Sequence, residues 1–211
     1  MRSNMYKEVI VWCSIILWSV NVGLSQPAFK VQSNMPKGTE SKSFIWNHLG
    51  GKYEYVSSYS VWCAQGNVRK FFVFAYKQGK WEKMLLYVYY KSSDLNNDNI
   101  KKVKSKKQKV KEEVEMDSLV HFWNQNKLWE LNTDSINISQ IEVGKPGSFS
   151  AVTTINIQDG CNHVLEVFDA NGYFWVSGYE PEKYQKKIPV KQRELFITCK
   201  NQFVQYWNSV R

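Results

Sequence analysis

The residues of this chain with the most distinctive chemistry are its four cysteines. Cys13 lies in an apolar N-terminal stretch that we expect to be removed, which leaves Cys63, Cys161 and Cys199. In an oxidising compartment, three cysteines allow one disulfide and one unpaired thiol. The spacing of the cysteines does not decide which two of them pair, and the third thiol is free to link two chains.

The other reactive side chains do not form a catalytic pattern. His48, His121 and His163 lie in separate segments, and none has metal-ligand spacing with a cysteine or an acid. Glu112 and Glu113 are adjacent, so on a strand they would point to opposite faces, which is poor geometry for paired acid–base work. The sequence also lacks a phosphate-binding loop and a nucleophile elbow. We therefore expect a protein that is not an enzyme and that has neither a metal nor a cofactor.

Two surface features suggest modification or binding. Asn137-Ile138-Ser139 is an N-glycosylation sequon, which predicts a surface position for Asn137. The stretch 101–111 is dominated by lysine and contributes much of the net charge of +9. It is either a patch for anions or glycosaminoglycans or an edge strand protected by lysine against pairing. We favour the edge strand, because no aromatic residue interleaves the run as nucleic-acid binding would require.

The chain divides into two processing segments and one domain. Residues 1–25 have a charged start, an apolar run from Val9 to Val22 and small residues before Gln26, as in a secretory signal peptide. Residues 26–42 are polar and contain Pro27, Pro36 and Gly38, which predicts a flexible leader. Residues 43–211 form the expected domain. The sequence thus predicts secretion and no membrane span.

Within the domain, β-type patterns dominate. Aromatic residues make up 15% of the chain, which favours strands. Residues 43–49 suit a short helix, and alternating residues then predict strands, with a hairpin whose turn is Asn171-Gly172. Pro181 begins an expected irregular linker, and apolar residues from Val190 onward recur at helical spacing. The strands are expected at 53–63, 68–76, 81–91, 119–122, 128–131, 149–157, 161–168 and 173–179.

This order predicts an all-β fold. Sequential strands joined by short turns favour an eight-stranded antiparallel up-and-down barrel over a Greek-key sandwich. A short N-terminal helix precedes the barrel, and an amphipathic C-terminal α-helix packs outside it with Cys199 on its apolar face. A barrel of this size holds side chains or one small ligand.

Four segments give the chain a family resemblance. They are Asp159-Gly160-Cys161, Val164-Leu165-Glu166-Val167, Gly172-Tyr173-Phe174-Trp175-Val176 and Cys199-Lys200-Asn201-Gln202-Phe203. In this order they resemble the tick salivary lipocalins, the histamine-binding protein family of the calycin superfamily. The resemblance spans residues 43–211 and implies a lipocalin barrel.

The resemblance also implies a disulfide and a ligand class. It pairs Cys161 with Cys199 and leaves Cys63 without its family partner, so we expect a monomer, with a Cys63-linked dimer as the alternative. The acids with which family members hold an amine are missing near Trp175 and near Val152. An apolar lipid from the host, such as a leukotriene, fatty acid or sterol, is therefore expected in place of histamine or serotonin.

The resulting expectation is a secreted salivary lipocalin that sequesters a small host inflammatory mediator. Its predicted pocket is lined by the ring-bearing strand residues Phe72, Phe74, Tyr87, Tyr89, Trp129, Phe174 and Trp175. Two alternatives stay open. One is an inhibitor that binds a host immune or haemostatic protein through its loops and the basic stretch 101–111. The other is an amine binder with a rearranged site.

Overall fold

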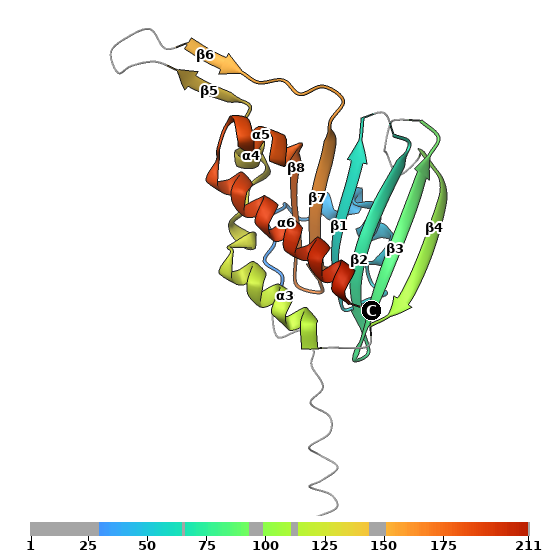
Figure 1. Ribbon diagram of the computed structural model, residues 1–211. Helices are drawn as coiled ribbons and strands as arrows, with labels where there is room; N and C mark the ends of the chain where they lie inside the picture. Colours follow the sequence, from blue (N-terminus) through green and yellow to red (C-terminus); the bar gives the residue numbers. More distant parts are fainter. Residues whose placement is uncertain (1–29, 65, 93–98, 111–113, 144–150, 211) are drawn as a thin grey trace, which may run out of the picture.

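The computed structural model describes residues 30–64, 66–92, 99–110, 114–143 and 151–210, and its centre is one antiparallel sheet (Figure 1). Six strands form this sheet in the order β4-β3-β2-β1-β7-β8. They are β1 (Tyr55–Cys63), β2 (Val68–Lys77), β3 (Lys80–Tyr90), β4 (Ile100–Lys109), β7 (Cys161–Asp169) and β8 (Tyr173–Tyr179). The expected signal peptide lies outside the described residues.

The predicted β-rich antiparallel fold is confirmed, but the described strands do not close into one barrel. β4 and β8 are the two edges of the six-stranded sheet. The strands β5 (Gln140–Val143) and β6 (Ala151–Thr154) pair only with each other, and Figure 1 shows them projecting away from the main sheet.

Strand β1 joins two parts of the chain that are far apart in sequence. It pairs with β2 on one side and with β7 on the other. Successive side chains of β1 point to opposite faces of the sheet, so that Tyr55 and Tyr59 face one core cluster and Val56 faces another. The sheet is therefore covered on both faces.

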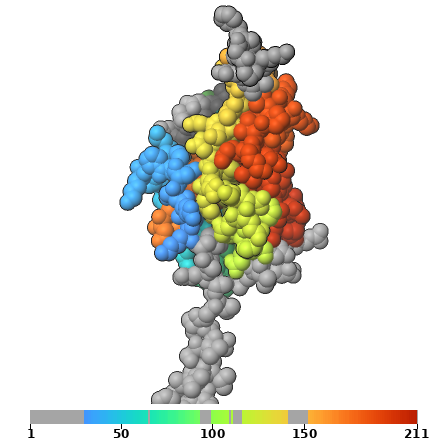
Figure 2. Space-filling view, turned by 90° about the vertical axis from the view of Figure 1, so that its left-hand side faces the viewer, coloured from blue at the N-terminus to red at the C-terminus, as the bar shows by residue number. Residues whose placement is uncertain are grey.

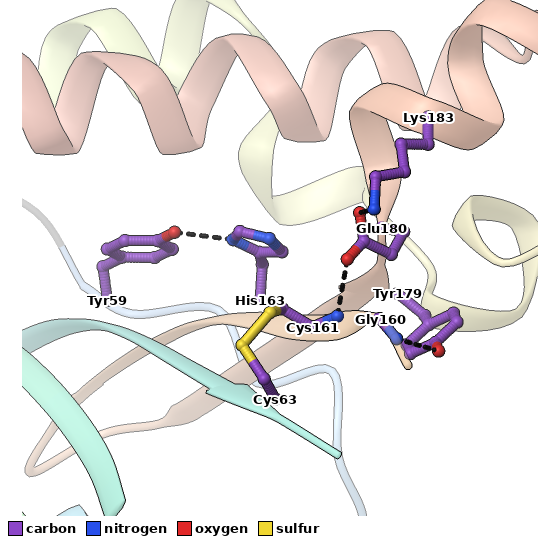
Figure 3. The surroundings of a disulfide bond; sticks show 8 residues. All are labelled: Tyr59, Cys63, Gly160, Cys161, His163, Tyr179, Glu180 and Lys183. Atoms are coloured by element: carbon purple, nitrogen blue, oxygen red, sulfur yellow. Dashed lines mark hydrogen bonds and ion pairs between the residues drawn. A yellow bond between two sulfur atoms is a disulfide. The ribbon is translucent and has the colours of Figure 1, made fainter. Parts of the chain in front are cut away.

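The disulfide lies at the end of this central ladder. Cys63 on β1 stands directly opposite Cys161 on β7 and is bonded to it. Figure 3 shows the surroundings of the bridge, where the Glu180 carboxylate accepts a hydrogen bond from the Cys161 backbone N–H at 2.7 Å. The pairing of Cys161 with Cys199 that the family resemblance implied is wrong, because the sheet register places Cys63 against Cys161. Cys199 is a free thiol, fully buried in the core.

Helices cover the face of the sheet that contains Tyr59. The C-terminal helix α6 (Lys191–Ser209) has Phe196, Cys199, Phe203 and Trp207 on its buried side, and the predicted position of Cys199 on the apolar face is confirmed. Helix α3 (Val114–Gln125) lies beside it, and the Trp123 indole N–H donates to the Cys199 carbonyl at 3.3 Å. The short elements η3 (Leu128–Glu130), α4 (Thr133–Ile136) and α5 (Pro181–Lys187) complete this layer.

Three expectations for these segments are wrong. Residues 119–122 lie in α3 and not in a strand, because Met116, Leu119, Val120 and Trp123 form a buried stripe at helical spacing. In the segment 128–131, Leu128–Glu130 form the short helix η3 and not a strand. The residues after Pro181 form α5 and not an irregular linker, because proline suits the first turn of a helix.

The N-terminal segment covers part of the other face. Helix α2 (Phe44–Leu49) buries Phe44, Ile45 and Leu49 there, and Ser43 caps it by accepting the Trp46 N–H at 3.0 Å. The short helix η1 (Thr39–Lys42) precedes it. Figure 2 shows segment 30–49 in blue on one flank, with α3 beside it and α6 beyond.

The described part of the expected leader is not loose. The Val31 side chain is buried, and its backbone N–H donates to the Asp169 carboxylate at 3.0 Å. Ser33 and Asn34 accept the backbone N–H groups of Tyr173 and Trp175, both at 2.9 Å. Ser33 and Asn34 thus bind the outer edge of β8 through their side chains.

The predicted hairpin of β7 and β8 is confirmed, but its turn differs from the expected one. Neither Asn171 nor Gly172 has a positive φ. The Asp169 carboxylate accepts their backbone N–H groups at 2.6 and 2.9 Å and holds the turn. A Cβ atom on Gly172 would lie 2.3 Å from the Val31 carbonyl oxygen, so close packing of the N-terminal segment requires glycine here.

The disulfide assignment gives a first prediction. Peptide mapping without reduction should recover Cys63 linked to Cys161, and an alkylating reagent should modify Cys199 only after unfolding. Replacing both bridged cysteines by serine should lower the free energy of unfolding by about 3–5 kcal/mol, because the bridge closes a long loop. Cys199→Ala serves as the control, with a smaller loss. A Cys161–Cys199 peptide in the map would contradict the assignment.

Candidate functional site

The seven aromatic residues predicted to line one pocket lie in three different places. Phe74 and Phe174 are fully buried in the core beneath α6, and Phe72 and Trp129 pack against the same core. Phe74 lies 5.4 Å from Phe203 and 5.3 Å from Trp207, measured between ring centroids. These four rings are therefore packed against other side chains of the protein.

The remaining three residues lie in two other places on the sheet. Tyr87 and Tyr89 lie half-buried on β3, on the helix-bearing face but close to edge strand β4. Trp175 packs against the opposite face, with the second core cluster. The structure thus does not bring the predicted set together.

Trp175 belongs to a cleft of about 320 Å³ on the α2 face of the sheet. This volume is at the small end of the range for ligand pockets. The cleft lies between the N-terminal segment and four strands: β1, β2, β7 and β8. Its lining residues are Met35, Thr39, Lys42, Ser43, Phe44, Trp62, Arg69, Asn162, Val164, Glu166, Tyr173 and Trp175.

A buried carboxyl group forms one wall of the cleft. Glu166 is only 2% exposed and stands directly across the β7–β8 ladder from Trp175. The Tyr173 hydroxyl donates to its Oε1 at 2.9 Å, and the Ser43 hydroxyl donates to the same atom. Burial raises the pKa of Glu166, while the hydrogen bond from Ser43 and the charge of Arg69 oppose this shift.

A guanidinium group lies close to this carboxyl. Arg69, at the start of β2, is less buried than Glu166, and its Nε and Nη2 donate to the Ser60 hydroxyl at 3.2 and 2.8 Å. Its Cζ lies 4.6 Å from the centre of the Phe71 ring. Burial lowers the pKa of Arg69, opposed by the nearby Glu166, but arginine keeps its charge in proteins. Two of its five N–H donors are thus used on Ser60.

Several polar atoms on this face lack partners. The Oδ1 atom of Asn162, the Oγ atom of Ser58 and the Oη atom of Tyr90 are buried without a hydrogen bond to any described residue. Ser58 stands directly opposite Glu166 in the β1–β7 ladder. Buried polar atoms normally have partners. Of these three residues, Asn162 lines the cleft, where a ligand or an ordered water molecule can supply the partner of its Oδ1 atom.

Sequence reasoning missed the polar half of this site. Glu166 interrupts an apolar strand, and a charge within such a strand is an available signal. Arg69 stands beside Lys70 at the start of β2, where a charge is ordinary and gives no such signal. Their proximity follows only from the register, in which β1 lies between β2 and β7.

His163 lies outside this cleft, with its ring stacked beside that of Tyr59. The Nδ1 atom of His163 lies 2.6 Å from the Tyr59 hydroxyl, and burial lowers the pKa of His163 (Figure 3).

Within the described residues, no group of three His, Cys, Asp or Glu side chains is placed to hold a metal ion. Across the same residues, no helix has the length and apolar character needed to cross a membrane.

Asn137 is exposed, as its sequon required. Its Nδ2 group donates to the Thr133 and Ser177 carbonyls at 3.0 and 3.2 Å, and its Oδ1 accepts the Tyr179 N–H at 2.8 Å. The amide therefore links α4 to β8. Glycosylation at this position stays a prediction.

Comparison of the chain with known proteins found no matching family model and no matching curated protein.

Adjacent residues on opposite faces of β8 give a second prediction. Phe174→Ala should lower the free energy of unfolding by about 3–5 kcal/mol, because it empties a buried site in the core. Trp175→Ala, whose ring borders the cleft, should cost about 1 kcal/mol. Chemical denaturation of both variants measures this difference. Equal losses would show that the cleft side is packed as tightly as the helix side.

The buried carboxyl gives a third prediction. The folded protein raises the pKa of Glu166 above the value of about 4.5 at which this carboxyl titrates in the unfolded chain. The free energy of unfolding should therefore fall as the pH rises from about 4.5 through the pKa of the folded protein. Glu166→Gln keeps an acceptor for Ser43 and Tyr173 and removes the titration. The difference between the unfolding free energies of the wild type and Glu166→Gln should therefore decrease as the pH rises through this range. A constant difference would contradict a raised pKa.

Proposed function

We propose that the protein is a secreted, lipocalin-like carrier that sequesters a small apolar molecule with an acidic head group in the cleft around Arg69. A leukotriene or a fatty acid has this chemistry, which makes either a candidate host mediator. The signal-like N-terminus supports secretion, and so does the disulfide, since disulfides persist in oxidising compartments.

The guanidinium of Arg69 is the observation that carries this proposal. It lies in a cleft with aromatic walls at Trp62 and Trp175, and only two of its five donors are bonded to Ser60. A planar guanidinium suits a carboxylate, which it can bind through two parallel hydrogen bonds. The rings of the walls suit the apolar part of the same ligand.

An acidic ligand fits this cleft better than an amine does. Glu166 is the acid that an amine would need, and it already accepts hydrogen bonds from Ser43 and Tyr173 while remaining 2% exposed. Its raised pKa favours the neutral form, which attracts a cation less. Arg69 is the more accessible charge. The amine binder with a rearranged site is therefore the second candidate, since Glu166 faces Trp175 across the ladder.

Four observations support the lipocalin part of the proposal. They are the sequence resemblance, the antiparallel sheet, the short helix α2 before the first strand and the helix α6 after the last strand. Closure of the sheet into an eight-stranded barrel belongs to this proposal and would require β5 and β6 to connect β4 with β8.

A binding titration tests the function and is our fourth prediction. Quenching of Trp62 and Trp175 fluorescence should report binding of a long-chain fatty acid. Arg69→Gln should raise its Kd about 10- to 100-fold, the range for losing a charged hydrogen bond. Lys77→Gln, at the far end of the same strand, is the matched control.

The methyl ester of the same fatty acid distinguishes the contribution of the carboxylate charge from that of the apolar chain. It should bind the wild type and Arg69→Gln equally well, because it carries no carboxylate. Preferential binding of an aromatic amine, lost in Glu166→Gln, would favour the amine alternative. An unchanged Kd for the fatty acid in Arg69→Gln would refute the assigned head-group site.

A further inference from the structure

We propose that the exposed edge of the sheet carries a second binding surface, independent of the cleft, for a sulfated polysaccharide. This surface, the lysine face, consists of Lys102, Lys104 and Lys106 on β4, Tyr87 and Tyr89 on β3, and Lys70 on β2. In Figure 1, β4 forms one edge of the sheet, and the helices α3 and α6 lie over the other half.

The strand geometry arranges these lysines in a row. Alternate residues of a strand share one face, and they repeat about every 6.6 Å. Lys102 pairs with Tyr89 and Lys104 with Tyr87, so the lysines lie directly beside the two rings. All three β4 lysines are exposed. The row is therefore a regular line of positive charge open to solvent.

The two tyrosines support the lysine side chains. The Lys104 ammonium lies 5.5 Å from the centre of the Tyr89 ring, and the Lys70 ammonium lies 5.8 Å from that of Tyr87. Such cation–π contacts hold an ammonium over an aromatic face. The run 101–111 itself contains no aromatic residue, because these rings come from the neighbouring strand.

The charge of the lysine face has no acid to balance it in the described structure. Between Asn99 and Val110 the sequence contains no Asp or Glu. Among the described residues, the ion pairs leave Lys70, Lys102, Lys104 and Lys106 without an acidic partner. Lys107, which pairs with Glu82 at 3.1 Å, points to the opposite face.

A hollow adjoins the row where a bulge shifts the register between Tyr89 and Tyr90. It has a volume of about 620 Å³, and Lys91, Lys101, Lys102, Lys104, Asn67 and Tyr89 contribute to its lining. Lysines on an edge strand also prevent pairing with other chains, and that role alone requires neither a hollow nor supporting rings.

A sulfated polysaccharide fits these features better than other polyanions do. The Tyr87 and Tyr89 rings each have a lysine ammonium over one face, which competes with the stacking of nucleic-acid bases there. The large exposed apolar residues of the described structure, Ile138 and Val152, lie elsewhere, so this face offers no apolar anchor for a membrane. A linear chain of sulfates matches the line of ammonium groups.

The test uses a heparin-derived octasaccharide, titrated calorimetrically against the whole protein over a series of NaCl concentrations. Replacing Lys102, Lys104 and Lys106 by Gln should raise its Kd about tenfold or more. The same change should reduce the salt dependence, the slope of log K against log salt, by about two to three, because fewer counterions are released. The control removes three exposed charges elsewhere, by Lys37→Gln, Lys186→Gln and Lys187→Gln, and should change both quantities little.

Three results would overturn the proposal. Equal losses in the two triple variants would mean that net charge alone drives binding. Failure of the wild-type protein to bind the octasaccharide at low salt would exclude the site. Tighter binding to duplex DNA or to vesicles containing phosphatidylserine, at the same salt concentration, would assign the surface to another class of partner. Fatty-acid binding should be unchanged in both triple variants, so this test and that of the cleft fail separately.

Discussion

The pairing of β1 with β7 holds the two halves of the sheet together. It joins the meander β1–β4 to the hairpin β7–β8 across a sequence separation of 98 residues, which the Cys63–Cys161 bond spans. Such a long-range ladder carries a large loop-closure entropy, and a covalent link at its end offsets part of that cost. Without this pairing, α6 would have no continuous surface to cover, and the two walls of the cleft would not meet.

The two faces of the sheet differ in what covers them. On the helix side, large rings from α3 and α6 fill the space over β1, β2, β7 and β8, and the free thiol of Cys199 is part of that packing. Burial raises the pKa of this thiol to about 12, which keeps it protonated and unreactive at neutral pH. On the other side, the described residues that cover the strands are those of a short helix and of the segment 31–42. A polar floor with unpaired atoms lies there, and it is the part of the molecule suited to take up a ligand.

Local patterns predicted the elements whose signals are local. The strands from Tyr55 to Tyr90, the β7–β8 hairpin, the edge position of the lysine-rich strand and the buried side of α6 all follow from periodicity and turn residues. The predictions that were wrong or missing have two causes. Short apolar runs such as 119–122 fit a strand or a helix equally well until the wider spacing from Met116 to Trp123 is considered. The disulfide, the convergence of Arg69 with Glu166 and the tyrosines beneath the lysines depend on strand register, which a single sequence does not specify.

We expect a small acidic ligand to occupy the cleft between the N-terminal segment and the sheet. Photo-crosslinking with a fatty acid that carries a diazirine near its carboxylate, followed by peptide mapping, tests this most directly. Labels are expected on Trp62, Asn162 and Trp175, and they should be lost when an excess of unlabelled fatty acid competes. Labelling confined to α3 or α6, or labelling that does not compete, would contradict a ligand site in the cleft.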